Sequence, residues 1–240
     1  MSDYEEVWTS ESFEDIIPMD NNYQERYIYS DYDEEYREAY RMASEFLEGE
    51  IWRKYWRYPL FLLDQLRCEI CPYAKNDKKF FEDWKNIIKT ETLGEGYCAR
   101  RDGVTYILYQ QDNSCPERKT YVFHHEGGHV IGVHSILYKD ILLSNDKQKD
   151  KLEDEATIIG RNVFLPAFII KYLLKSFDYE TVKKYYNKVY HVSKQYFDVR
   201  FKHLEKDLRN MIYPECIKEE AEKELNDLEN WYFLETLVSF

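Results

Sequence analysis

The sequence predicts a predominantly helical α+β fold, in which one helix packs under a small β-sheet and a C-terminal helical region follows. Three observations support this prediction. Apolar residues recur at helical spacing through most of the chain after residue 33. The β-prone run 100–110 contains an Arg101-Asp102-Gly103 turn and indicates a hairpin. A chain of 240 residues, 44% of them hydrophobic, is long and apolar enough to bury a core.

Helices are predicted on both sides of the hairpin. Before the hairpin, helical patterns cover 33–66 and 78–92. After it, Ser114-Cys115-Pro116-Glu117 reads as a capping box with proline in the first turn, which begins a helix. Ser193 is the predicted N-cap of one of the later helices. The remaining helices are predicted over 153–166, 168–175, 179–191, 193–211 and 215–237.

Charge and composition divide the chain into three predicted segments. Residues 1–50 form an acidic, tyrosine-rich segment with 16 acidic and 3 basic residues, so the whole net charge of −13 lies there. Residues 51–170 form the domain that contains the hairpin, and residues 171–240 form the C-terminal helical region. The acidic segment is interpreted as a solvated arm, or alternatively as an arm that docks on a basic partner or imitates one. Like-charge repulsion argues against its binding nucleic acid directly.

The most informative motif lies in the helix after the hairpin, where His125-Glu126-Gly127-Gly128-His129 matches HExxH. Residues four apart project from one face of a helix, so both imidazoles can bind one divalent metal ion. Glu126 lies beside the first ligand and can act on water as a general base. Two glycines inside a helix cost roughly 1 kcal/mol each, which suggests a close approach to the backbone there.

A tetrahedral zinc site of this type needs a third protein ligand and keeps its fourth position for water. His134 is five residues beyond His129, about 140° around the helix, which favours a rim or core position for it. The acidic start of the helix predicted over 153–166 offers Glu153, Asp154 and Glu155 instead. A glutamate from a second helix would complete a His₂Glu site.

The run Glu155-Ala156 to Leu165-Pro166, together with HExxH, resembles the ImmA/IrrE-type metallopeptidases over about residues 100–166. Their second motif reads roughly E-A-N-x-F-A-x-x-L-L-M-P. Glu155, Ala156 and Pro166 agree in register, and Leu165 stands in place of a methionine of similar size, whereas Thr157, Ile159, Gly160 and Phe164 depart. The resemblance implies a zincin-like domain with one Zn²⁺ ion held by His125, His129 and Glu155. It also implies cleavage of a protein substrate, a DNA-binding repressor of the helix-turn-helix type.

In the mechanism that this site implies, Glu126 takes a proton from the attacking water and hands it to the leaving nitrogen. A further donor to the developing oxyanion is expected from a histidine or tyrosine. His124, Tyr190 and His191 are the candidates that the sequence offers.

Other features set limits on location and on alternative chemistry. No signal peptide and no apolar run of membrane-spanning length is apparent, which predicts a cytoplasmic protein without a membrane partner.

Cys68-Glu69-Ile70-Cys71 is a CxxC, but no second CxxC completes a zinc site, so we interpret both cysteines as ordinary semi-buried thiols one helical turn apart. The segment around Val192-Ser193 could be a helix-turn-helix, but its mixed charge favours packing.

Two alternatives to a zinc-dependent endopeptidase remain open at this level. The fold could bind metal without hydrolysing peptide bonds and act in binding or sensing. The acidic N-terminal segment could also be the main functional element, as an effector carried on a zincin scaffold, or could cover the protein's own cleft.

Overall fold

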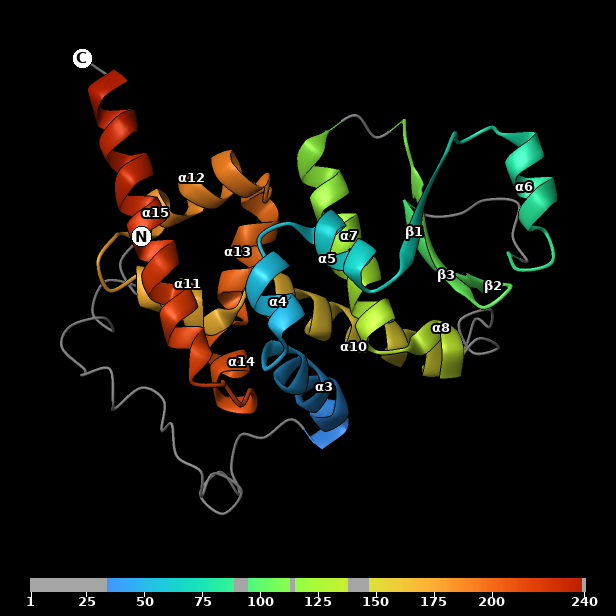
Figure 1. Ribbon diagram of the computed structural model, residues 1–240, viewed down its shortest axis with the longest axis horizontal. Helices are drawn as coiled ribbons and strands as arrows, with labels where there is room; N and C mark the ends of the chain where they lie inside the picture. Colours follow the sequence, from blue (N-terminus) through green and yellow to red (C-terminus); the bar gives the residue numbers. More distant parts are fainter. Residues whose placement is uncertain (1–33, 89–94, 113–114, 138–146, 239–240) are drawn as a thin grey trace.

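The computed structural model describes residues 34–88, 95–112, 115–137 and 147–238, so the predicted arm of residues 1–33 lies outside the described part of the chain. It has the predominantly helical α+β architecture that the sequence predicts. In Figure 1 the sheet with α6 forms one end of the molecule and helices α11 to α15 form the other. Helices α7 and α10 lie between the two ends and are in extensive contact with each other.

The first half of the chain supplies short helices and all three strands of the sheet. The short helices include a 3₁₀ turn, and α5 begins with a proline at its first position, where its missing N–H costs nothing. The elements are η1 (Glu34–Tyr36), α3 (Arg37–Leu47), α4 (Glu50–Tyr55), α5 (Pro59–Gln65), β1 (Cys68–Tyr73), α6 (Lys78–Trp84), β2 (Gly96–Arg101) and β3 (Val104–Gln110).

The predicted hairpin is confirmed as β2 and β3, which pair antiparallel across the Asp102-Gly103 turn. Both turn residues have positive φ, as the two-residue turn that suits the strand twist requires. Strand β1, which the sequence reading missed, pairs parallel with β3. The strand order is therefore β1-β3-β2, and β2 lies at an edge of the sheet.

Helices cover both faces of the sheet, and neighbouring side chains on β3 point to opposite faces. Ile107 packs with Leu63 and Phe123, which places this face against α5 and α7. Leu108 packs with Phe80 and Trp84 of α6 on the other face. The strand thus fixes the helix that carries HExxH under the sheet.

Strand β1 also corrects the interpretation of the CxxC. Cys68 and Cys71 lie on a strand rather than one helical turn apart, and three residues along a strand put side chains on opposite faces. Burial raises the pKa of the Cys68 thiol to about 11, and both cysteines are free thiols. Within the described ranges, neither belongs to a group of potential metal ligands.

The second half of the chain is helical. Its elements are α7 (Pro116–Ile131), α8 (His134–Leu137), α10 (Lys147–Phe164), α11 (Ala167–Leu173), α12 (Tyr179–Tyr190), α13 (Lys194–Lys202), α14 (Leu204–Asn210) and α15 (Cys216–Val238). The N-cap role of Ser193 is confirmed, since its hydroxyl accepts a hydrogen bond from the Tyr196 N–H. The predicted helix over 193–211 is broken at His203 into α13 and α14. Cys115 rather than Ser114 is the N-cap of α7 and makes no side-chain cap bond; Ser114 lies outside the described residues.

The main hydrophobic core contains residues of all three segments that composition suggested, from Ala39 of α3 through Phe164 of α10 to Leu228 of α15. This core therefore crosses both predicted segment boundaries, at residues 50 and 170. The division into three segments remains a prediction about how the chain is organised.

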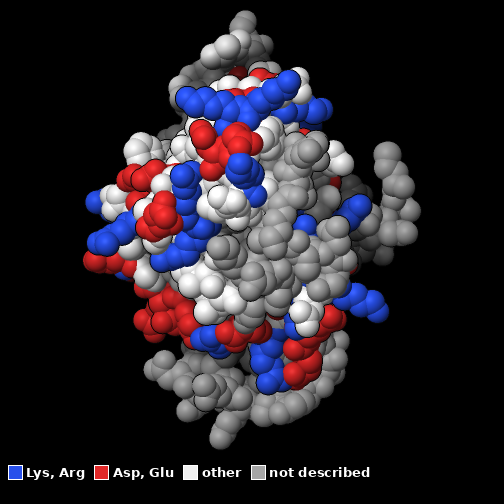
Figure 2. Space-filling view, turned by 90° about the vertical axis from the view of Figure 1, so that its right-hand side faces the viewer, with Lys and Arg blue, Asp and Glu red and all other residues white. Residues whose placement is uncertain are grey.

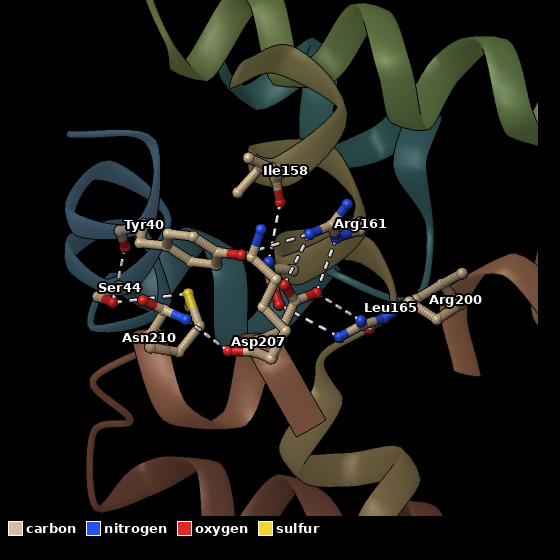
Figure 3. Close-up of polar contacts among 11 residues, drawn as sticks. Tyr40, Ser44, Ile158, Arg161, Leu165, Arg200, Asp207 and Asn210 are labelled. Carbon is tan, nitrogen blue, oxygen red and sulfur yellow. Dashed lines mark hydrogen bonds and ion pairs between the residues drawn. The ribbon is translucent and has the colours of Figure 1, made fainter. Parts of the chain in front are cut away.

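A buried ion cluster joins four helices inside this core (Figure 3). Asp207 of α14 accepts hydrogen bonds from Arg161 of α10, from Arg200 of α13 and from the Tyr40 hydroxyl of α3. Arg200 also donates to the carbonyl oxygen of Leu165. Arg200 and Asp207 are both fully buried. This burial agrees with the packing interpretation of the segment that follows Val192-Ser193.

Figure 2 shows basic and acidic side chains interspersed on the end of the molecule that carries the sheet. Among the described residues, no single helix has both the length and the apolar character of a membrane span. Helices α10 and α11 pass that test only together, and a bend of 44° separates them.

Candidate metal centre and cleft

Helix α7 positions three of the predicted site residues. His125, Glu126 and His129 lie in its second half, and both imidazoles face α10, which crosses α7. The rings of His125 and His129 are 5.0 Å apart, as expected for residues one turn apart on one face.

Glycines allow α7 and α10 to approach so closely. A Cβ built on Gly128 would overlap the Ala156 carbonyl group of α10, with the carbonyl carbon 2.7 Å away. A Cβ on Gly160 of α10 would meet the His124 carbonyl carbon at 2.9 Å. The contact is therefore reciprocal and lies next to both ligand positions. It accounts for Gly128, whose place inside a helix is otherwise unfavourable.

Gly128→Ala should therefore destabilise the protein, by about 2 to 3 kcal/mol of unfolding free energy, and weaken metal binding. The atoms that the new methyl group meets belong to the backbone, so no side-chain truncation relieves the overlap. Denaturant unfolding of the metal-free protein measures the effect.

Gly127→Ala is the matched control, because there the added Cβ meets the Phe164 ring, 2.7 Å from Cε2. Phe164→Leu should recover part of the loss at position 127 and none at position 128. A Gly128→Ala protein as stable as the parent would show that the close crossing is not required.

The carboxylate of α10 that meets the two imidazoles is that of Glu153. Its Oε2 lies 3.0 Å from His125 Nε2 and 3.4 Å from His129 Nε2. The ligand atoms of His125, His129 and Glu153 all lie within 4.8 Å of one another. Two imidazole nitrogens and one carboxylate oxygen are a donor set that suits a divalent zinc ion.

In this geometry Glu153, rather than the expected Glu155, faces the two imidazoles. Helix α10 begins at Lys147, six residues before the predicted start, so Glu153 lies inside the helix. Residues two apart on a helix project about 200° apart, so Glu153 and Glu155 cannot both face the imidazoles. Glu155 Oε2 instead lies 3.5 Å from His134 Nε2. Asp154, the other candidate, accepts a hydrogen bond from the Tyr36 hydroxyl.

The protonation states of His129 and Glu153 favour a bound cation, whereas His125 has to lose a proton before it can bind one. Burial lowers the pKa of His129 to about 4, which keeps its imidazole neutral. Burial would raise the pKa of Glu153, but hydrogen bonds with His125 and His129 outweigh it and hold this pKa well below its usual range. Burial would lower the pKa of His125, but the hydrogen bond to Glu153 and the charge of Glu126 raise it. Metal binding requires neutral imidazoles and an ionised carboxylate.

Glu126 is held between α7 and the edge strand β2. It is 5% exposed, and burial raises its pKa to about 7. The backbone N–H of Cys98 on β2 donates a hydrogen bond to its carboxylate. A Cβ on Gly96 would lie 2.5 Å from Val122 Cγ1 and 2.7 Å from Glu126 Oε1, so this glycine lets the strand approach the acid. A carboxyl group with a pKa near neutrality can both accept and return a proton.

These groups line an open cleft of about 360 Å³ between α7 and β2. Residues 95–98 form the strand side of the cleft. On the helix side, Tyr121 lies one turn before His125, with the two rings stacked at 6.3 Å and 14°. Arg118, one turn earlier still, forms an ion pair with Glu95 across the cleft.

The three candidates for oxyanion donor do not line this cleft. His124 is buried against Phe164 and Tyr196. Tyr190 donates to Glu224, and His191 is the exposed C-cap of α12. Tyr97 and Tyr121 line the cleft instead, and sequence reasoning missed both. The spacing of Tyr121, four residues before His125, was the available signal.

Comparison with known proteins places the chain among peptidases. The family described as the IrrE N-terminal-like domain, peptidase family M78, matches residues 72–202, which include both site helices. Comparisons with curated proteins and with solved structures found no significant match.

Proposed function

Because the chain belongs to the IrrE N-terminal-like family of metallopeptidases, we propose that it is a zinc-dependent endopeptidase. His125, His129 and Glu153 would hold one Zn²⁺ ion, and Glu126 would be the general base. The observation that supports this most directly is the convergence of the three donor atoms beside a buried carboxyl group with a pKa of about 7.

The residues of the cleft have separate roles in the proposed reaction. Bound zinc would supply Lewis-acid polarisation of the scissile carbonyl and lower the pKa of water in the cleft. The Glu126 carboxylate would take a proton from the attacking water and deliver it to the leaving nitrogen. Tyr97 and Tyr121 are the cleft-lining hydroxyl groups that could donate to the oxyanion. Burial raises the pKa of Tyr97 to about 12, so it remains a donor.

An extended polypeptide fits the cleft as substrate. Strand β2 is an edge strand, and its residues Gly96 to Cys98 line the cleft beside Glu126. An extended peptide can pair with such an edge through main-chain hydrogen bonds. Cleavage of a helix-turn-helix repressor in the cytoplasm is the finer proposal, and the family resemblance alone supports it.

Glu153→Ala and Glu155→Ala test the ligand set, because the two variants differ only in which carboxylate α10 loses. Glu153→Ala should lose stoichiometric zinc on dialysis against a weak chelator, since a direct ligand is gone. Glu155→Ala should retain one ion per chain with lower affinity. Zinc content measured by elemental analysis decides between them. The reverse outcome would make Glu155 the ligand and overturn the proposed site.

A further inference from the structure

His134 lies directly behind the metal-facing side of His129. Its Nδ1 is 2.9 Å from His129 Nδ1, and the two rings are 5.1 Å apart at 76°. His134 is 2% exposed. The predicted rim or core position is thus confirmed as a core position. The backbone path differs from the expected one, because helix α7 ends at Ile131 and the turn that follows returns the chain beneath His129.

The chain can return beneath His129 only because the turn before His134 adopts an unfavourable backbone conformation. Val133 has φ of +49°, an outlier for a β-branched residue. A Cβ on Gly132 would lie 2.5 Å from His134 Nε2, so only glycine leaves room for the ring. Such strain, on the order of 1–3 kcal/mol, persists only where the surroundings enforce it, and it commonly marks functional positions.

Glu155 lies on the far side of His134, with its Oε2 3.5 Å from His134 Nε2. One arrangement of protons satisfies the whole series. His129 Nε2 faces the proposed ion, so its Nδ1 carries the hydrogen and donates to His134 Nδ1. His134 then carries its own hydrogen on Nε2, directed towards the Glu155 carboxylate.

The other imidazole has an outer partner of the same kind. His125 Nδ1 lies 3.2 Å from the Thr157 hydroxyl oxygen. That hydroxyl donates its hydrogen to the Glu153 carbonyl oxygen, so it can only accept from His125. Each ligand imidazole thus has an acceptor at Nδ1, and each Nε2 faces Glu153.

We infer that His134 and Glu155 are positioning residues of the metal site, which fix the tautomer and ring orientation of His129. This inference rests on the proposed zinc site and extends it. Such outer partners typically contribute tenfold to a hundredfold in metal affinity. The glutamate of the Glu155-Ala156 pair therefore acts on the ion through His134 rather than as a ligand.

The test is the zinc dissociation constant of the full-length chain, measured by competition with a chromophoric chelator. His134→Leu should weaken binding by about 10- to 100-fold. His134→Asn, whose side-chain oxygen can replace Nδ1 as acceptor, should recover much of that loss. Glu155→Gln should fall between the parent and His134→Leu. His191→Asn, at an exposed left-handed position that asparagine tolerates, removes a histidine remote from the cleft and should change nothing.

A second measurement reads the proton positions without any substitution. Long-range ¹H–¹⁵N spectra of the zinc-loaded parent should show His134 as the Nε2–H tautomer and His129 with hydrogen on Nδ1. Parent-like affinity in a folded His134→Leu protein, or an Nδ1–H tautomer at His134, would overturn the inference and leave the proposed function standing. A parent chain that binds no zinc would overturn the proposed function itself.

Discussion

We expect Glu126→Gln to reduce peptide-bond hydrolysis by a factor of about 10² to 10⁴ while leaving one zinc ion per chain. Glutamine has the same shape and fits the same buried position between α7 and β2, so the ligands should remain in place. Its amide cannot accept the proton of the attacking water, whereas the Glu126 carboxyl group has a pKa of about 7 and can. The loss should therefore appear in kcat rather than in zinc content.

The assay should not depend on the natural substrate, because the identity of that substrate is itself a proposal. A library of fluorogenic peptides can be screened with the zinc-loaded parent and then applied to the variant. Glu117→Gln, in the first turn of the same helix and outside the cleft lining, is the matched control and should cleave normally. Normal cleavage by Glu126→Gln would rule out the proposed base. A parent that binds zinc and cleaves no peptide would favour the non-hydrolytic alternative.

The second large effect concerns stability. Asp207→Ala should lower the free energy of unfolding by about 3 to 5 kcal/mol, because it leaves two buried guanidinium groups without their counter-charge. Arg200 is fully buried and Arg161 nearly so, and both donate to this one carboxylate. Denaturant unfolding measures the change.

Glu205→Ala provides the control within the same helix. Glu205 is exposed and pairs with Lys171 at 3.0 Å, so its removal should cost at most about 1 kcal/mol. Equal effects at positions 205 and 207 would mean that the buried cluster contributes no more than an exposed pair.

The same cluster should make the protein sensitive to acid. Burial would raise the pKa of Asp207, but Arg200 and Arg161 outweigh it and hold the pKa below its usual range. A depressed pKa in the folded state stabilises the protein above the unfolded pKa, about 3.9, and this stabilisation is lost as pH falls through the folded value. The difference in unfolding free energy between parent and Asp207→Asn should therefore be constant near neutrality and shrink below about pH 4. A difference that grows on acidification would contradict this assignment.

The local sequence could predict those features that a single turn, helix or strand specifies without its neighbours. The Asp102-Gly103 turn requires positive φ, so the hairpin was predictable from two residues. The serine at 193 caps its own helix. HExxH places His125 and His129 on one face of α7 by helix geometry alone, which made both candidate ligands visible without a structure.

Tertiary structure decided everything that depends on how one element is rotated against another. The sequence by itself determined the two imidazoles and the acid between them, and it narrowed the third donor to three neighbouring carboxylates. Which of these carboxylates faces the imidazoles depends on the rotation of α10 against α7, which the backbone contacts at Gly128 and Gly160 fix, and it is Glu153 that does so. The place of His134 came from a strained turn rather than a helix. The periodicity of a helix orders its own side chains around one axis, but packing with a second helix selects the side chain that faces the site.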